Sequence, residues 1–430
     1  MSLVSGDYKK RLVDKKIKDY LGVFGAISIE GPKWCGKTWS SLNNAKSVIY
    51  MDDEENQEVA DLDVKSIFQH DKKLKPQLID EWNLVPKIWD ATRRECDKTT
   101  ERGNYILTGS TTLPKKQKKE KIKHSGAGRI GIIKMYTMSL YESGDSNGKA
   151  SIMAMYNGTQ KSMSVESKEL KTIANLIVRG GWPGNIDTDE NKIGLIPKGY
   201  INNILTKDMI DDKDKKRDVN KMRMLMKSLA RNETSLASNK TIINDIAEIS
   251  SENDMISTSV TLVDYLDVLN RLYLIENQEA YSINYRSPER VGKISKKHYT
   301  DPSLTCSLLG LNSEKLLKDL NTFGLLFEAL VERDLRIYMD YLDGRLYHFR
   351  DNVTGLEVDS IIEFEDGEYA AIEIKLGANK IDEATETLNK FYKSMIKKPK
   401  FMCIIVGKGN AIAHDKKSNI YIVPITTLKP

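Results

Sequence analysis

The stretch Gly31-Pro32-Lys33-Trp34-Cys35-Gly36-Lys37-Thr38 decides how the first part of this chain folds. It matches the pattern GxxxxGK[ST] at every fixed position, directly after the apolar segment Ala26-Ile-Ser-Ile-Glu and before a helical stretch. A strand that turns through such a loop into a helix aims backbone N–H groups and the helix N-terminus at one point, where phosphate binds. The sequence therefore predicts that residues 31–38 form a loop that cradles the phosphates of a nucleotide.

Two residues of this loop and two later carboxylates complete the expected site. Lys37 is expected to contact the β- and γ-phosphates, and the Thr38 hydroxyl to bind Mg²⁺. The string Leu78-Ile79-Asp80-Glu81 ends a second apolar strand. We expect Asp80 to hold the Mg²⁺ shell through water, and Glu81 to orient or deprotonate the attacking water. Neighbouring residues of a strand point to opposite faces, so the two carboxylates suit separate roles. ATP and Mg²⁺ are the cofactors that this set predicts.

Two further residues are candidates for contacts to the γ-phosphate. Ser110 closes the strand Asn104-Tyr-Ile-Leu-Thr with Gly109, where a small hydroxyl residue is placed to sense that phosphate; a plain turn is the competing interpretation. Arg129 follows the glycine-containing stretch His124-Ser-Gly-Ala-Gly and is a candidate for an arginine finger that acts within its own chain. An ordinary surface arginine is the other interpretation.

The spacing of apolar segments divides the chain into three parts. Residues 1–143 alternate short apolar runs with helical patterns, which predicts βαβ units and a mainly parallel sheet, as in a P-loop NTPase. A stretch rich in Gly, Ser and Asn at 143–160 is expected to be a loop or linker. Residues 164–300 are mostly helical, and residues 301–430 follow the order α-β-β-β-α-β, with helices near 323–342 and 382–396.

The middle part contains a pattern that resembles a winged helix. Apolar positions in 242–249 and 260–269 are spaced as in a helix-turn-helix, and 272–277 is a candidate wing strand. The would-be recognition helix, residues 258–271, holds Asp264 and Asp267 against Arg271, a net charge of −1. Phosphate neutralisation supplies most nonspecific DNA affinity, so we favour a packing or protein-partner module over a DNA reader. The lysine patch at 115–123 is a separate candidate contact for nucleic acid, with a solvated loop as the simpler interpretation.

Composition limits the classes of protein to consider. The chain has 430 residues, with 40% hydrophobic and 30% charged residues and a net charge of 66 − 61 = +5. This length predicts about three domains, and the apolar content excludes disorder over most of the chain. The sequence shows neither a membrane-length apolar run nor a secretion signal, and its four cysteines form no CxxC pair. We therefore expect a cytoplasmic protein with no contact to a membrane, no disulfide framework and no zinc ribbon.

A series of short motifs in fixed order resembles one protein family nearly end to end. The chain is similar to the bacterial and archaeal AAA-type ATPases with a C-terminal domain of unknown function related to PD-(D/E)XK nucleases. The resemblance implies the roles given above for Lys37, Thr38, Asp80 and Glu81, and it leaves the biological task open. The motifs that carry it are Gly31–Thr38, Ile79-Asp-Glu-Trp, Ile106-Leu-Thr-Gly-Ser, Ser125-Gly-Ala-Gly-Arg, Met138-Ser-Leu-Tyr-Glu, Arg179-Gly-Gly-Trp-Pro, Leu229-Ala-Arg-Asn, Asp301-Pro-Ser-Leu, Gly324-Leu-Leu-Phe-Glu, Glu357-Val-Asp and Ile372-Glu-Ile-Lys.

The C-terminal motif defines a second candidate site. Glu373 and Lys375 are two residues apart on an apolar strand and share one face. Asp359 ends a run on the preceding strand, and Glu328 lies on the helix before. In a PD-(D/E)XK nuclease, Asp359 and Glu373 would bind Mg²⁺, Lys375 would position or activate water, and Glu328 would support the metal shell. A salt-bridged, half-exposed strand surface is the competing interpretation.

Three functional hypotheses follow from these patterns. The leading one is an enzyme that hydrolyses ATP with Mg²⁺ and changes conformation with its nucleotide state. The second is a metal-dependent DNA nuclease gated by ATP. The third is a nucleotide-dependent scaffold that binds a protein partner and turns ATP over slowly or not at all. An arginine that reaches a neighbour's nucleotide would imply an oligomer, which the sequence leaves open.

Overall fold

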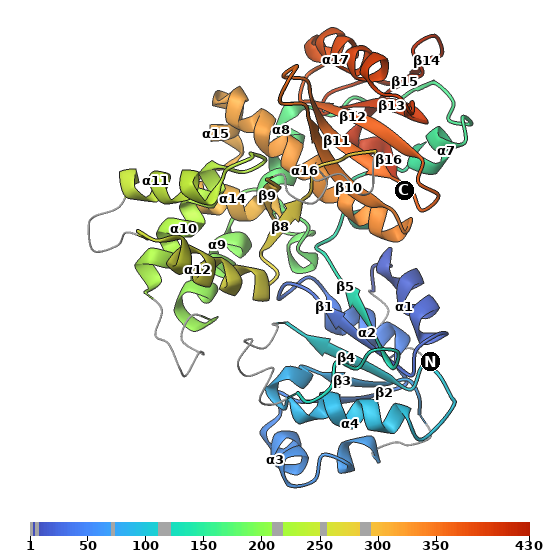
Figure 1. Ribbon diagram of the computed structural model, residues 1–430, viewed down its shortest axis with the longest axis vertical. Coiled ribbons are helices and arrows are strands. Elements are labelled where there is room, and N and C mark those ends of the chain that lie inside the picture. The colour runs from blue at the N-terminus through green and yellow to red at the C-terminus, as the bar shows by residue number, and fades with distance from the viewer. Residues whose placement is uncertain are drawn as a thin grey trace. The chain divides into compact units, whose positions relative to one another are not determined.

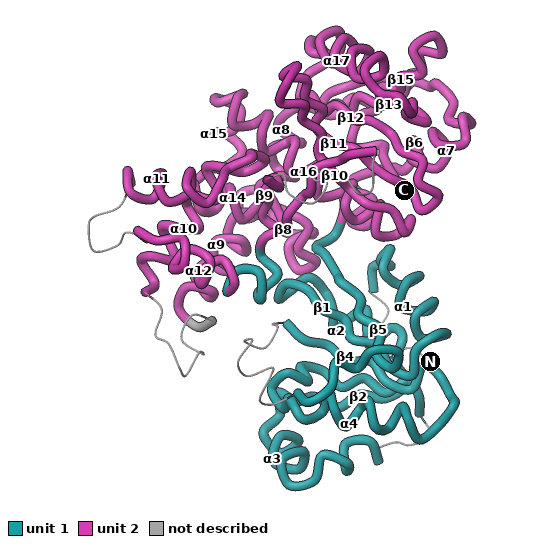
Figure 2. The backbone as a smooth tube through the Cα atoms, in the orientation of Figure 1, with its two compact units in different colours: residues 1–138, 268–274 teal, residues 139–267, 275–430 magenta. Residues whose placement is uncertain are grey.

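The alternation of apolar runs and helical segments in the first part of the chain builds a parallel sheet between helices. Figure 1 shows the computed structural model. Contacts divide the chain into unit 1, residues 1–138 and 268–274, and unit 2, residues 139–267 and 275–430 (Figure 2). The structure describes residues 3–4, 8–69, 74–110, 122–208, 218–249, 256–283 and 294–430.

Unit 1 contains a five-stranded parallel sheet in the order β2-β3-β4-β1-β5. Successive strand residues point to opposite faces, and each face carries its own apolar core. One core includes Ile27 and Ile17, and the other Ile79 and Ile88. The elements are α1 (Val13–Leu21), β1 (Ala26–Glu30), α2 (Lys37–Asn44), β2 (Ser47–Tyr50), α3 (Glu54–Leu62), β3 (Gln77–Asp80), α4 (Lys87–Cys96), β4 (Tyr105–Gly109) and β5 (Ile130–Lys134). The predicted parallel sheet of a P-loop NTPase is confirmed.

The register of this sheet determines which predicted site residues meet. Glu30 at the end of β1 pairs with Gly109 at the end of β4, and Asp80 ends β3, the strand beside β4. The loop after β1, the carboxylate of β3 and the hydroxyl residue after β4 therefore lie at one edge of the sheet. β5 begins beside the opposite end of β1, where Ala26 pairs with Ile130.

Unit 2 is built on a seven-stranded mixed sheet in the order β10-β11-β12-β13-β15-β14-β7, where β7 is Met163–Ser164. The predicted α-β-β-β-α-β order is observed, with α16 and α17 at the expected places. Its elements are α16 (Leu320–Tyr341), β10 (Arg345–Arg350), β11 (Glu357–Glu363), β12 (Tyr369–Lys375), α17 (Ile381–Ser394), β13 (Phe401–Val406), β14 (Ala411–Asp415), β15 (Ile420–Pro424) and β16 (Leu428–Lys429). Burial is nearly complete along β12 and β13.

The middle part of the chain supplies further helices of unit 2 and two short antiparallel strands, β8 and β9. Helices occur at both expected helix-turn-helix positions, and β8 follows them where a wing strand was predicted. The last turn of α12 and the residues after it belong to unit 1. The elements are α6 (Leu140–Ser143), α8 (Leu170–Arg179), α9 (Leu195–Asn203), α10 (Val219–Arg231), α11 (Asn239–Ile249), α12 (Ser259–Arg271), β8 (Ile275–Gln278), β9 (Lys296–Tyr299), α14 (Pro302–Leu309) and α15 (Ser313–Lys318).

The prediction of a linker at 143–160 is wrong. This stretch holds β6 (Ala150–Ser151) and α7 (Ile152–Tyr156), and β6 pairs with β16 near the end of the chain. The Ser151 side chain accepts a hydrogen bond from the Ala154 backbone and caps α7. Buried Ile152 and Met155 anchor the helix, so a few well-spaced apolar residues outweigh the polar composition.

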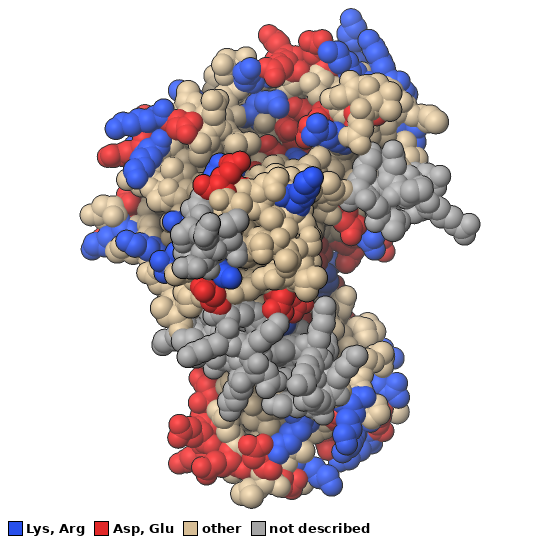
Figure 3. Space-filling model, turned by 60° about the vertical axis from the view of Figure 1, so that its left-hand side comes forward, with Lys and Arg blue, Asp and Glu red and all other residues tan. Residues whose placement is uncertain are grey.

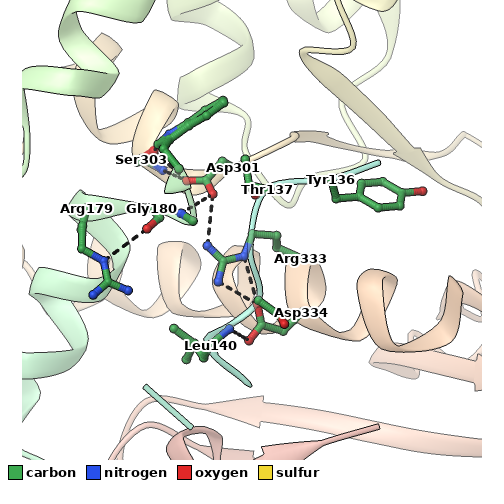
Figure 4. A network of polar contacts seen from close by, with 12 residues as sticks. Tyr136, Thr137, Leu140, Arg179, Gly180, Asp301, Ser303, Arg333 and Asp334 are labelled. Atoms are coloured by element: carbon green, nitrogen blue, oxygen red, sulfur yellow. Dashed lines mark hydrogen bonds and ion pairs between the residues drawn. The ribbon is translucent and has the colours of Figure 1, made fainter. Parts of the chain in front are cut away.

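Three of the short motifs meet with Arg333 and Asp334 of α16 in a buried network (Figure 4). Asp301 accepts hydrogen bonds from the Gly181 backbone and from Arg333 of α16. At Gly180, whose φ is +69°, a Cβ would lie 2.4 Å from an oxygen of Asp301, so only glycine fits. Arg333 also bonds Asp334, whose other oxygen accepts from the Leu140 backbone at 2.9 Å. These motif residues therefore hold unit 2 together.

Surface charge is mixed on the face drawn in Figure 3. Basic and acidic side chains are interspersed over unit 2, and acidic side chains gather at the lower left of unit 1. The segment 52–63 of unit 1, which includes α3, holds seven acidic residues, all exposed. Most of the predicted lysine patch, residues 115–121, lies outside the described residues. Within the described ranges, no helix combines the length and the apolar character of a membrane span.

Candidate nucleotide-binding site

The predicted phosphate loop is the turn between β1 and α2. Gly36 caps α2 with φ +103°, a conformation that side chains other than glycine rarely adopt. A Cβ on Gly31 would lie 2.2 Å from the Met135 carbonyl oxygen, so this position also requires glycine. Trp34 has a φ of +66° at the exposed tip, and Pro32 and Cys35 are buried. Lys33 is half-buried. The turn geometry explains why the motif needs its two glycines.

Lys37 points into the loop. Its side chain is buried, and its ammonium donates hydrogen bonds to the carbonyls of Gly31 at 3.0 Å and Pro32 at 2.9 Å. Both of these hydrogen-bond partners are neutral carbonyl groups, while the Asp80 carboxylate interacts with the Lys37 charge at longer range. This is the position expected for a lysine that contacts phosphate.

Thr38 and Asp80 lie side by side, as a shared Mg²⁺ site requires. The Thr38 hydroxyl donates to the two Asp80 carboxylate oxygens at 3.1 and 3.2 Å. Thr108 of β4 donates to the same carboxylate. Burial raises the pKa of Asp80, and the neighbouring charge of Glu81 adds to this shift, while the hydrogen bond from Thr108 opposes it. The oxygen donors of Thr38 and Asp80 fit the ligand preference of Mg²⁺.

Glu81 lies after the end of β3. The expectation that Asp80 and Glu81 point to opposite faces of one strand therefore does not apply to it. Its φ of +52° and ψ of +44° place it in the left-handed region, a conformation that costs a non-glycine residue on the order of 1 kcal/mol. The turn directs its carboxylate to Ser110, which donates from both its backbone N–H and its hydroxyl. The Glu81 backbone N–H in turn donates to Thr108 at 3.2 Å. Ser110 therefore positions the Glu81 carboxylate, and its contact with the γ-phosphate stays a prediction.

Arg129 is placed differently from the prediction. It precedes β5, beside the Ala26 end of β1, whereas the phosphate loop follows the other end at Glu30. The two positions are separated by the length of a five-residue strand, roughly 15 Å along the sheet. Its guanidinium pairs with Asp97 at 2.9 Å and lowers the pKa of that carboxylate. The prediction that Arg129 is a finger within its own chain is therefore wrong.

The segment before α1 braces the loop, and the sequence analysis missed it. Arg11 is buried and donates to the carbonyls of Cys35 at 2.8 Å, Tyr136 at 2.9 Å and Thr137 at 3.2 Å. Tyr8 donates to Ser40 of α2, which follows the loop, at 2.9 Å. The position of Arg11 within a charged N-terminal stretch gives no sign of this role.

Tyr273 contributes a second contact near the loop. Its hydroxyl donates to a carboxylate oxygen of Glu30, the residue directly before Gly31, at 2.6 Å. Tyr273 lies two residues after α12 and has a φ of +57°. Both residues belong to unit 1, so the chain returns to unit 1 at this point.

The four residues of the second candidate site lie near one another in unit 2, but their oxygens are bound by ammonium groups. Lys375 pairs with Glu373 at 2.7 Å and with Asp359 at 3.4 Å. Glu328 of α16 pairs instead with Lys296 of β9 at 2.8 Å. Burial together with repulsion from Asp359 raises the pKa of Glu373 to about 8. Among the described residues, no group of acidic, histidine or cysteine side chains is arranged to hold a metal ion.

Comparisons with known domain families agree with the fold of unit 1. Residues 24–143 match the model of an AAA domain. With the parallel sheet and the phosphate loop, this match makes the first part of the chain an AAA-type, P-loop ATPase-like domain. Residues 170–315 match a domain of unknown function (DUF8612), and residues 323–428 match another (DUF4143). Neither match tests the nuclease relationship, which stays a prediction.

Two solved structures are similar to this chain at low sequence identity. The Walker-type ATPase PABY2304 of Pyrococcus abyssi is 12% identical, with 72% of this chain and 98% of that chain covered and a TM-score of 0.46. The ORC2 protein of Aeropyrum pernix, solved as ADPNP–ADP complexes, is 10% identical, with 75% and 96% covered and a TM-score of 0.34. No curated protein matches the sequence.

Proposed function

We propose that this chain binds ATP with Mg²⁺ and hydrolyses it. One observation carries the proposal: two separate segments of the chain meet at the edge of the sheet where the phosphate loop turns. They bring together Lys37 and Thr38 from one segment and Asp80 and Glu81 from the other. Each has the chemistry that phosphoryl transfer to water requires at this place. The AAA match of residues 24–143 points the same way.

Each residue has a defined task in this mechanism. The loop amides and Lys37 bind and neutralise the phosphates. Thr38 and Asp80 would hold Mg²⁺, which when bound offsets the charge on the phosphate oxygens. Glu81 takes a proton from the attacking water, and Ser110 fixes the direction of its carboxylate through two hydrogen bonds.

Titration calorimetry with a non-hydrolysable ATP analogue tests nucleotide binding. Lys37→Ala is expected to weaken affinity at least about 100-fold, because a buried cation that faces phosphate is removed. Lys33→Ala is the matched control, since Lys33 lies in the same loop at a position the motif leaves free, and a change within about threefold is expected. Unchanged affinity in Lys37→Ala would refute the proposal.

A phosphate-release assay distinguishes hydrolysis from the scaffold alternative. The enzyme hypothesis requires steady phosphate release that stops in Lys37→Ala. The scaffold hypothesis requires tight nucleotide binding with little or no release. Glu81 accepts two hydrogen bonds that orient it, an arrangement that favours the enzyme.

An ATP-gated, metal-dependent nuclease is the second candidate. The proximity of Asp359 on β11, Glu373 on β12 and Lys375 favours a fold related to PD-(D/E)XK nucleases. Incubation with plasmid, Mn²⁺ and ATP tests it, with Glu373→Ala plus Lys375→Ala as the control. It ranks second because ammonium groups bind the carboxylate oxygens that a metal would need.

The proposal extends to assembly, partners and location. The mixed charge in Figure 3 favours a protein partner over DNA on that face. Arg129 lies far from the phosphate loop of its own chain, so a role at a nucleotide would require a neighbouring copy. Analytical ultracentrifugation with and without ATP tests this oligomer. We also propose a cytoplasmic location.

A further inference from the structure

The carboxylate cluster of unit 2 contains a lysine that the nuclease resemblance does not include. Lys296, on β9, is 2% exposed, and its ammonium lies 2.8 Å from Glu328, 3.6 Å from Glu332 and 3.2 Å from the Asp359 carbonyl oxygen. β9 belongs to the middle part of the chain and lies outside the α-β-β-β-α-β order. A cation from one part of the chain therefore lies among the carboxylates of another.

The carboxylates of the cluster pair with ammonium groups of the same chain. The Lys296 ammonium lies within 3.6 Å of the Glu328 and Glu332 carboxylates. Lys375 lies between Asp359 and Glu373. The buried Lys296 and the half-buried Lys375 thus occupy positions among the carboxylates that a divalent cation would need.

One oxygen of each carboxylate expected to bind metal already has a partner. Asp359 Oδ2 accepts the Ile374 backbone N–H at 2.7 Å and faces Lys375. Glu373 Oε2 accepts from Lys375, and Glu328 Oε1 from Lys296. A divalent metal that used both oxygens of these carboxylates would have to break part-buried ion pairs, and removing one partner of a fully buried pair commonly costs about 3–5 kcal/mol.

The next inward-facing side chain of β9 also lies beside carboxylates. His298, two residues after Lys296 and on the same face, lies 3.4 Å from Glu332 and 3.3 Å from Glu233. Lys297 between them donates instead to the Ala237 carbonyl at 3.2 Å. Because neighbouring residues of β9 point to opposite faces, Lys296 lies in the cluster and Lys297 lies outside it. Replacement of Lys297 is therefore a matched control for replacement of Lys296.

We propose that the Lys296 ammonium, which contacts Glu328 and the Asp359 carbonyl oxygen, is a built-in cation that prevents a divalent metal from binding to the cluster of Glu328, Asp359 and Glu373. The inference is independent of nucleotide binding by unit 1. It makes the C-terminal cluster a structural link between β9, α16 and the sheet.

Mn²⁺ binding to the full chain, measured by electron paramagnetic resonance, tests the proposal. The substitution Glu373→Gln is introduced into the wild type and into each variant. Mn²⁺ that is lost on this substitution was bound at the cluster, whereas Mn²⁺ bound by Asp80 remains. In the wild type and in Lys297→Met, Glu373→Gln is expected to leave Mn²⁺ binding unchanged. Lys296→Met is expected to gain a site at least about tenfold tighter, which Glu373→Gln removes.

Two outcomes would overturn the proposal. One is a wild-type Mn²⁺ site that Glu373→Gln abolishes, since this would mean that Lys296 does not exclude metal. The other is a folded Lys296→Met variant that gains no such site. If Lys296→Met does not fold, Lys296→Gln removes the charge while keeping a donor for Glu328, and the same two outcomes apply. As a second readout, Mn²⁺ should raise the thermal midpoint of the Lys296 variant but not that of Lys297→Met.

Discussion

Replacement of Arg11 by Met tests whether the segment before α1 holds the phosphate loop. Methionine keeps most of the packing volume but removes the donors to three main-chain carbonyls. Hydrogen bonds from a charged group contribute about 1.5–3 kcal/mol each, and buried carbonyls left without donors add a penalty. Because the three bonds share one side chain they are not additive, and we expect unit 1 to lose about 3–5 kcal/mol.

The loss should appear in both stability and nucleotide affinity. At 2–4 °C per kcal/mol, the thermal midpoint of unit 1 should fall by roughly 10 °C. Affinity for an ATP analogue should fall on the order of tenfold, because the Cys35 carbonyl and the turn around it lose their anchor. Calorimetry on the folded variant measures both quantities.

Arg102→Met is the matched control. Arg102 is exposed and donates to the Gly22 carbonyl at 3.2 Å, so its replacement should change stability by less than about 0.5 kcal/mol. If Arg11→Met unfolds with the same free energy as the wild type, or binds the analogue equally well, the bracing role assigned to Arg11 is incorrect.

Three further predictions concern single residues. Glu81→Gln should slow phosphate release at least about 100-fold while ATP affinity stays within threefold, and an unchanged rate would exclude Glu81 as the base. Arg129→Ala should leave hydrolysis by dilute protein within about twofold; a loss above tenfold would place Arg129 at a nucleotide. Burial raises the pKa of Glu233 to about 8, so the folded chain keeps a proton that the unfolded chain releases near pH 4.5. The wild type should therefore lose stability relative to Glu233→Gln as pH rises from 5 to 8, by up to about 1.4 kcal/mol per pH unit in urea unfolding, and parallel pH profiles would contradict this assignment.

The phosphate loop was predictable because its chemistry is local. Two glycines, a lysine and a hydroxyl residue at fixed spacing constrain one turn, and that turn needs no information from elsewhere in the chain. Asp80 followed from the same logic, since parallel strands bring their carboxyl ends to one edge. The predicted elements of the last part were also found, because each has a clear period of apolar residues.

Residues that act across long sequence separations were missed or misplaced. Arg129 follows a glycine-containing stretch, but strand register, which the sequence does not reveal, places it at the far end of the sheet. Glu81 was expected on a strand because a left-handed glutamate has no sequence signature. Lys296 stands in a polar string, Lys296-Lys297-His298, whose strand conformation depends on pairing with β8.

The two buried lysines differ in what they bind, and this difference predicts which of them can exchange partners. Lys37 donates to two neutral carbonyls, so a triphosphate that replaces them gains the attraction of several negative charges and breaks no ion pair. Lys296 lies among carboxylates inside unit 2, where its withdrawal would leave buried charges without compensation. The first cation is thus available to a ligand, and the second is committed to the fold. We therefore expect ligand-dependent chemistry in unit 1, even though unit 2 holds more of the buried ionisable groups among the described residues.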